Sequence, residues 1–198
     1  MIARGGRGFV LICAVAAAAA YLLDYRVTIG LAAFGAFLAI MFRDPSRAPG
    51  PGVVAPADGV IREVDQATGL VSTYLALRNV HVTRNPVECK VISVVRSDGK
   101  HAPAYSTNSH VNERVEMRLR SVIGDLRLIE MTGAIARRIV PYVRGGERLH
   151  KGDRLSLIRF GSRVDLFLPP PAHIVVAKGQ KVKAGVTPIA EVSDADLR

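Results

Sequence analysis

Three residue types in this sequence could together carry out nucleophilic chemistry: a serine after a glycine, a histidine in a β-rich segment and an aspartate before a glycine. Ser162 follows Gly161 between two predicted strands, and its hydroxyl could act as a nucleophile if a base took its proton. The ordinary pKa of histidine lies near neutrality, so His81 is a candidate base, and Asp58 is the acid that precedes Gly59. Taken singly, Gly-Ser and Asp-Gly are typical of turns. The GxSxG pattern of a nucleophile elbow does not occur here.

The charge balance bears on the partners of the chain. The 198 residues include 27 Lys and Arg against 17 Asp and Glu, a net charge of +10. An excess of this kind attracts nucleic acid or anionic lipid. No nucleic-acid-binding motif occurs, so a phospholipid membrane is the expected partner and nucleic acid is not. Cys13 and Cys89 belong to no CxxC or His/Cys cluster, so neither a zinc site nor a disulfide between them is expected.

Residues 1–47 are expected to form a membrane anchor of two apolar helices. Apolar runs cover residues 9–23 and 27–42. Neither reaches the ~20 residues that a spanning helix usually needs. A helical hairpin that dips into or barely crosses the bilayer is favoured, because basic residues at both ends place both ends on the cytoplasmic side of the cell membrane. A single helix with one half at the interface, or a cleaved signal peptide, is the alternative.

The remaining residues, 48–198, are predicted to form a mainly β domain. Short β-rich runs separated by turn signals are typical of an all-β sandwich or barrel. A short helical turn is the interpretation of residues 133–138. The predicted strands cover residues 60–64, 70–75, 80–83, 91–95, 115–119, 126–131, 139–143, 155–158, 164–168 and 174–176.

A duplicated half-motif refines this fold. Residues 146–158 and 179–189 each begin with a GxxxxxG pattern, in which two glycine turns flank a short strand. The pattern resembles the barrel-sandwich hybrid of lipoyl and biotinyl carrier domains. A carrier would have a Lys between the half-motifs, and residues 159–165 contain none. The resemblance also supplies an alternative function, a non-enzymatic, membrane-anchored lipoyl-like β-sandwich adaptor.

Several short blocks, in order along the chain from about residue 42 to 191, resemble the phosphatidylserine decarboxylase family in its short form. Each block is weak by itself, and their order behind an apolar N-terminus makes the resemblance specific. The blocks are Phe42-Arg43-Asp44-Pro45, Ala55-Pro56-Ala57-Asp58-Gly59, Asn79-Val80-His81-Val82, Asn112-Glu113-Arg114, Gly133-Ala134-Ile135-Ala136-Arg137-Arg138-Ile139 and Phe160-Gly161-Ser162-Arg163-Val164-Asp165.

The resemblance implies self-cleavage between residues 161 and 162. The Ser162 hydroxyl attacks the Gly161 carbonyl, and elimination releases a β chain (1–161) and an α chain (162–198). Residue 162 becomes dehydroalanine and hydrolyses to a pyruvoyl group. The family match implies that His81 is the processing base and that Asp58 orients it. The product is a heterodimer of these two chains, and a higher oligomer is left open.

The resemblance also implies the reaction. A pyruvoyl cofactor forms a Schiff base with phosphatidylserine, accepts electrons as CO₂ leaves, and releases phosphatidylethanolamine, so no metal is required. Longer members carry a second His where Arg78 stands here, which leaves the proton donor of decarboxylation open, with His81 one candidate. Arg137 and Arg138 could contact the lipid phosphate. Ester and ether lipid backbones are equally consistent with the sequence. A pyruvoyl enzyme for a soluble amino acid is disfavoured, because it would gain nothing from an apolar anchor.

Overall fold

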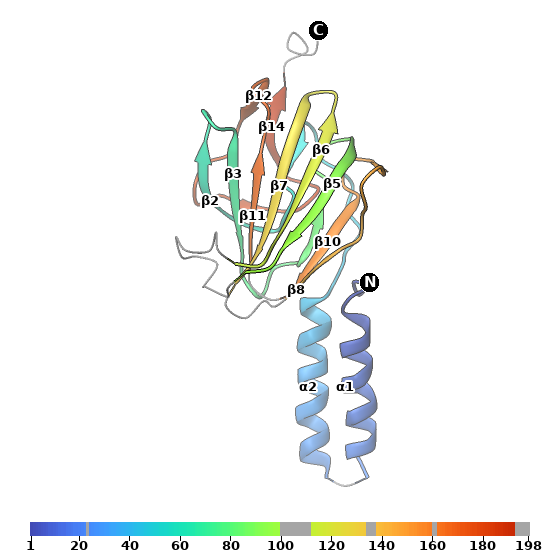
Figure 1. Cartoon of the computed structure of the whole chain (residues 1–198). Helices are drawn as coiled ribbons and strands as arrows, with labels where there is room; N and C mark the ends of the chain where they lie inside the picture. The colour runs from blue at the N-terminus through green and yellow to red at the C-terminus, as the bar shows by residue number, and fades with distance from the viewer. Residues whose placement is uncertain (23, 100–111, 134–137, 160–161, 193–198) are drawn as a thin grey trace. The chain divides into compact units, whose positions relative to one another are not determined.

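The N-terminal part of the chain forms two helices. The computed structural model describes residues 1–22, 24–99, 112–133, 138–159 and 162–192, and the chain divides into two compact units, Met1–Ser46 and Arg47–Arg198. In the first unit, α1 (Arg7–Ala20) and α2 (Tyr25–Met41) correspond to the two apolar runs. The Asp24 side chain accepts a hydrogen bond from the N–H of Arg26, at 2.8 Å, and so caps α2. The prediction of two apolar helices is confirmed (Figure 1).

The two helices fold back on each other as a hairpin. Ile2 forms an antiparallel bridge with Arg43, so the residues before α1 lie beside those after α2. A Cβ on Gly6 would collide with the Phe42 ring, which shows how closely these ends pack. Within the part of the chain that the structure describes, neither helix combines the length and the apolar character that crossing a bilayer requires. The attachment of this hairpin to a membrane stays a prediction.

The second unit is mainly β, as predicted. All the strands that the structure describes lie in this unit, and their pairings are antiparallel. The strands are β1 (Val53–Val54), β2 (Gly59–Asp65), β3 (Leu70–Leu75), β4 (Val82–Arg84), β5 (Cys89–Ser97), β6 (Arg114–Ser121), β7 (Gly124–Thr132), β8 (Arg138–Pro141), β9 (Arg148–Leu149), β10 (Arg154–Arg159), β11 (Ser162–Phe167), β12 (Ala172–Ile174), β13 (Lys181–Val182) and β14 (Pro188–Val192).

Three open sheets contain these strands. The largest has eight strands in the order β13-β2-β3-β11-β7-β6-β5-β9, and the smaller sheets have the orders β1-β14-β12 and β4-β10-β8. Figure 1 shows β11 between β3 and β7, with β6 and β5 following. The chain therefore passes from one sheet to another between β10 and β11.

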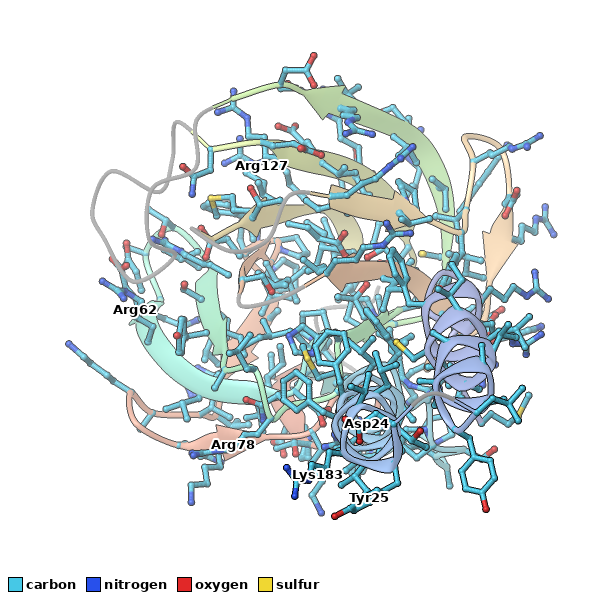
Figure 2. The ribbon with its side chains drawn as sticks, turned by 90° about the horizontal axis from the view of Figure 1, so that it is seen from below. Asp24, Tyr25, Arg62, Arg78, Arg127 and Lys183 are labelled. Carbon is cyan, nitrogen blue, oxygen red and sulfur yellow. The ribbon has the colours of Figure 1, made fainter. Side chains whose placement is uncertain are left out.

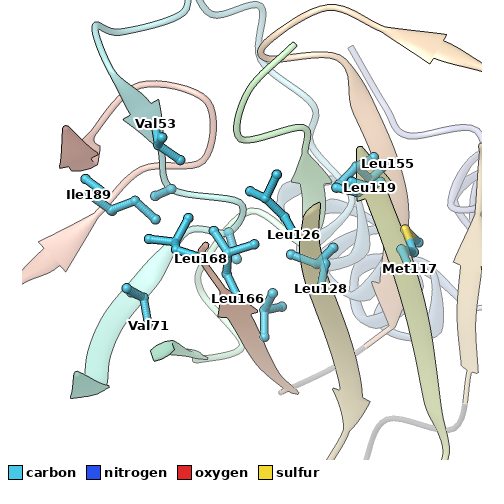
Figure 3. Packing of buried hydrophobic residues seen from close by; sticks show 14 of the residues in the cluster. Val53, Val71, Met117, Leu119, Leu126, Leu128, Leu155, Leu166, Leu168 and Ile189 are labelled. Carbon is cyan, nitrogen blue, oxygen red and sulfur yellow. The ribbon is translucent and has the colours of Figure 1, made fainter. Parts of the chain in front are cut away.

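The core lies on the inner face of the large sheet, where side chains alternate with the pleat. On β6, Val115, Met117 and Leu119 are fully buried, whereas Arg118 and Arg120 between and after them are exposed. Figure 3 shows the apolar side chains that β7 and β11 add, including Leu126, Leu128 and Leu166. Apolar and polar residues thus alternate with a period of two in the sequence, and this pattern favours strands with one buried face.

The duplicated glycine turns are present. Gly146 and Gly152 flank β9, Gly179 and Gly185 flank β13, and all four have positive φ, from 75° to 95°. Each half-motif is therefore a short strand between two left-handed turns, which confirms the predicted local geometry. The likeness to a barrel-sandwich hybrid stays a prediction.

Two other expectations need correction. The helical turn predicted for residues 133–138 falls largely outside the described residues, and its last residue, Arg138, begins strand β8. Strands β1 and β14 were not predicted, because β1 has two residues and β14 begins at a proline. They pair with each other in the three-stranded sheet β1-β14-β12, which short local patterns do not indicate.

Candidate active site

Ser162 is the first residue of β11, not part of a turn between strands. It pairs with Leu75 of β3 on one side and with Thr132 of β7 on the other. Its side chain is fully buried, and its Oγ has no hydrogen-bond partner among the described residues. Leaving a buried hydroxyl unsatisfied costs about 1–3 kcal/mol. A cost of this kind is expected where the hydroxyl is kept for chemistry.

The bond before Ser162 lies in the connection between two sheets. Strand β10 ends at Arg159 in the sheet β4-β10-β8, and β11 begins at Ser162 in the eight-stranded sheet. Gly161, the other residue of the predicted cleavage site, falls outside the described residues. The connection nevertheless begins at the end of β10 in one sheet and ends at the start of β11 in the other, so both of its ends are held by strand pairing.

His81 lies directly before β4 and is 1% exposed. Its carbonyl oxygen accepts a hydrogen bond from the N–H of Ile158, at 3.0 Å. Ile158 belongs to β10, the strand that leads to the cleavage site. The backbone of His81 is therefore fixed to a position four residues before Ser162, which is consistent with the predicted role of His81.

Asp58 lies in the turn before β2 and is buried. Arg47 donates two hydrogen bonds to its carboxylate, at 2.5 and 2.9 Å, and the N–H of Ala184 donates a third, at 2.8 Å. A carboxylate has about four acceptor positions, so these bonds leave at most about one for another donor. The predicted role of Asp58 in orienting His81 stays a prediction, and Arg47 is a partner that the sequence did not indicate.

Two arginines lie beside the cleavage site. Arg138 of β8 is directly opposite Arg159 of β10, the last described residue before Ser162. Burial lowers the pKa of Arg159, and the positive charge of Arg138 lowers it further. Like charges opposite each other on adjacent strands destabilise the pair, so an anion bound between them would be stabilising. Arg137, the other predicted phosphate contact, is outside the described residues.

A positively charged pocket of about 600 Å³ lies at the end of β3. Asp58 and Tyr74 form part of its wall, and Arg78, Lys181 and Lys183 bring three cations to it. Figure 2 shows Arg78 and Lys183 on the same side of the β unit. Among the described residues, no group of three or more His, Cys, Asp or Glu side chains is placed to hold a metal ion.

The comparisons with known proteins identify the family of the chain. The family model described as phosphatidylserine decarboxylase matches residues 34–190. A phosphatidylserine decarboxylase proenzyme of Streptomyces coelicolor is 41% identical over 199 residues, covering 95% of this chain and 91% of its own. A Halobacterium salinarum protein, provisionally named an archaetidylserine decarboxylase proenzyme, is 47% identical over 165 residues, which cover 80% of this chain and 82% of its own. The chain therefore belongs to the phosphatidylserine decarboxylase family.

Proposed function

We propose that this chain is a proenzyme that cuts itself between Gly161 and Ser162 and then converts phosphatidylserine to phosphatidylethanolamine and CO₂. The observation that carries the proposal is the Ser162 hydroxyl, which is buried and has no hydrogen-bond partner within the described part of the chain. Family membership and the printed names of the relatives support it. The relatives include both phosphatidylserine and archaetidylserine decarboxylases, so the lipid backbone is left open.

Self-cleavage would begin with attack of the Ser162 Oγ on the carbonyl carbon of Gly161. The C–N bond between the two residues breaks as the C–O bond forms, so the amide becomes an ester. Loss of the Ser162 α-proton with the Cβ–O bond then leaves a carboxylate on Gly161 and dehydroalanine at residue 162. Water converts the dehydroalanine to a pyruvoyl group and releases ammonia. The attack removes the hydroxyl proton of Ser162 and the elimination removes its α-proton, so a base near Ser162 is required.

His81 is the proposed base, and Asp58 is proposed to support it. The hydrogen bond from Ile158 to the His81 backbone holds His81 against β10, the strand that leads to the cleavage site. The two hydrogen bonds from Arg47 fix the Asp58 carboxylate and the turn in which it lies. We propose that Arg47 is a structural partner of this acid in processing.

The pyruvoyl group supplies an electron-accepting ketone, which is the chemistry that decarboxylation of an amino acid head group needs. The phosphate of the head group is proposed to bind between Arg138 and Arg159, because their paired positive charges lie beside the cleavage site. His81 would hold the proton that the product requires after CO₂ leaves. No metal takes part in this scheme.

The helical hairpin is proposed to attach the chain to the cell membrane without spanning it, with the β domain on the cytoplasmic side. Its exposed apolar side chains include Leu11, Ile12, Ile29 and Phe34, which would lie in the headgroup and acyl boundary. The net charge of +10 would add attraction to anionic lipid. A barrel-sandwich arrangement of the β domain is proposed from the paired half-motifs.

The mass of the purified full-length chain tests the proposal. Intact mass spectrometry under denaturing conditions should find residues 1–161 and residues 162–198, with a pyruvoyl group in place of Ser162. Incubation with phosphatidylserine should release CO₂. The variant Ser162→Ala should stay one chain and release none.

A single uncut wild-type chain that releases no CO₂ would overturn the proposal. That outcome would favour the alternative, a membrane-attached β-sandwich adaptor. Arg127→Gln is a matched control, because Arg127 is exposed and lies five residues along β7 from Thr132, the residue paired with Ser162. It should be cleaved like the wild type.

A further inference from the structure

A carboxylic acid occupies a core position of β7. Glu130 follows Leu126 and Leu128 in the inward-facing row of this strand and is fully buried. The strands on either side place Val115 and Val164 directly opposite it. A charged residue in such a row is costly unless other groups satisfy it, so its partners decide what Glu130 does.

Two hydroxyl groups from the neighbouring sheet satisfy Glu130. Thr83 of β4 lies 2.7 Å from one carboxyl oxygen, Ser156 of β10 lies 2.6 Å from the other, and the two hydroxyl oxygens are 2.8 Å apart. The three side chains therefore form a closed ring of three short O···O contacts, here called the carboxyl–hydroxyl ring. All three residues are fully buried.

Counting protons shows which form of Glu130 the ring requires. Each of the three contacts needs one proton between its oxygens. If Glu130 is ionised, Thr83 and Ser156 supply only two protons, and one pair of oxygens faces each other without a hydrogen. If Glu130 is protonated, three protons serve three contacts and each group donates once and accepts once. The ring is therefore complete only with a neutral Glu130.

The burial of the carboxyl favours the same form. Burial raises the pKa of Glu130 to about 7, and the hydroxyls of Ser156 and Thr83 oppose that rise. The proton count is independent of this value, since it depends only on the three distances. Both observations describe an acid that retains its proton in the folded chain at mildly acidic pH.

Each member of the ring lies two residues along its strand from a residue at the cleavage site. Thr83 follows His81 by two residues, and Ser156 precedes Ile158, which binds the His81 backbone, by two. Glu130 precedes Thr132, the partner of Ser162, by two. The ring thus joins β4 and β10 of one sheet to β7 of the other, at the point where the chain crosses between them.

We propose that the carboxyl–hydroxyl ring of Glu130, Thr83 and Ser156 is a positioning device that holds His81 in register with Ser162 for self-cleavage. The inference rests on the proposed processing function. Glu130 acts through the strands it joins and is not itself a catalytic residue. An error of about 1 Å in the alignment of reacting groups can slow a reaction about a hundredfold, so a link between the two sheets has a large effect on rate.

The test compares two substitutions of Glu130 in the full-length chain. Glu130→Gln supplies an amide N–H and a carbonyl oxygen, so three contacts still have their protons. Glu130→Leu has a similar volume and closes no ring. The rate of appearance of residues 162–198 by intact mass should be within about threefold of wild type for the Gln variant and at least about tenfold lower for the Leu variant.

A control separates positioning from loss of stability. Leu126→Ala removes core volume on the same face of β7 and should lower the thermal midpoint. Well below that midpoint it should cleave at the wild-type rate. Should Glu130→Leu fail to fold, Thr83→Val removes one hydroxyl at nearly constant volume and should slow cleavage by at least about tenfold.

The outcomes distinguish this inference from the proposed function. An uncut wild-type chain would overturn both. Normal cleavage of the wild type together with wild-type rates in Glu130→Leu or Thr83→Val would overturn only the positioning device. A Gln variant as slow as the Leu variant would contradict the ring of three protons, and a slow Leu126→Ala would show that lost stability alone slows the reaction.

Discussion

At the scale of single residues, the ion pair between Arg47 and Asp58 is a buried, two-pronged interaction at the site. Both side chains are about nine-tenths buried, with exposures of 11% and 10%. Removing one member of a buried pair costs about 3–5 kcal/mol, because the other charge stays buried without compensation. We predict that Arg47→Met loses stability of this order, as measured by denaturant unfolding of the uncut Ser162→Ala chain.

The double variant Arg47→Met with Asp58→Asn is the control for that prediction. It removes both charges, so its loss of unfolding free energy should be clearly smaller than the sum of the losses in the two single variants. Additive losses would show that the two side chains do not depend on each other. Arg47→Lys should retain part of the stability, because an ammonium keeps the charge and loses the two-pronged geometry.

The pair of arginines gives a second prediction, about substrate affinity. Arg138→Gln should raise the KM for phosphatidylserine in mixed micelles about tenfold, the effect of one lost hydrogen bond to a charged group. Its thermal midpoint should not fall, because the change removes a positive charge that faces Arg159. Lys183→Gln, in the separate positively charged pocket, is the matched control. A raised KM in the Lys183 variant alone would place the phosphate in that pocket.

At the scale of elements, the turns of the half-motifs depend on glycines whose positive φ other residues rarely adopt. Gly146 has φ of +95°, and nothing lies within 4 Å of a Cβ placed on it, so substitution there tests backbone strain alone. Gly152 has φ of +86°, and its Cβ would lie 2.9 Å from Pro49. We predict that Gly146→Ala costs about 1–2 kcal/mol and Gly152→Ala more, by denaturant unfolding. Equal losses of stability in the two variants would show that the Cβ at residue 152 and Pro49 move apart without an energetic cost.

The elements also show which features of the structure local sequence patterns can predict. Alternation in β6 and β7 is strong because one face is buried, and those strands were predictable. Ser162 was placed in a turn because Gly and Ser favour turns, whereas pairing with β3 and β7 makes it part of a strand. The pairing of Arg47 with Asp58, and of Glu130 with two hydroxyls, depends on contacts between distant segments. Local patterns carry no information on such contacts.

The carboxyl–hydroxyl ring makes stability depend on pH. The pKa of Glu130 is about 7 in the folded chain against 4.5 ordinarily, so the folded state holds a proton that the unfolded state has lost between these values. Stability therefore falls as pH rises through this range, by about 3 kcal/mol in total at ~1.4 kcal/mol per pH unit. In the uncut Ser162→Ala chain, Glu130→Gln should remove this slope. The Ser162→Ala variants with and without Glu130→Gln share His81 and all other titrating groups. A dependence of stability on pH that is the same in both variants would contradict the assignment to Glu130.

At the scale of the whole molecule, cleavage would cut the chain without undoing its sheets. Residues 162–198 contain β11, β13 and β14, which pair with β3 and β7, with β2, and with β1 of the larger chain. Val164 and Leu166 of β11 are fully buried in the shared core. Separating the two chains would expose this core and break six-residue pairings on both sides of β11.

We therefore predict that the cleaved protein remains a heterodimer held without a covalent bond. Native mass spectrometry should find the two chains in one particle, and only denaturant should separate them. Because the surface between the chains is part of one hydrophobic core, their separation should coincide with the loss of β structure in circular dichroism as denaturant increases. Release of the small chain at a denaturant concentration that leaves the β signal intact would contradict this account. It would mean that β11 is held at the edge of the core rather than inside it.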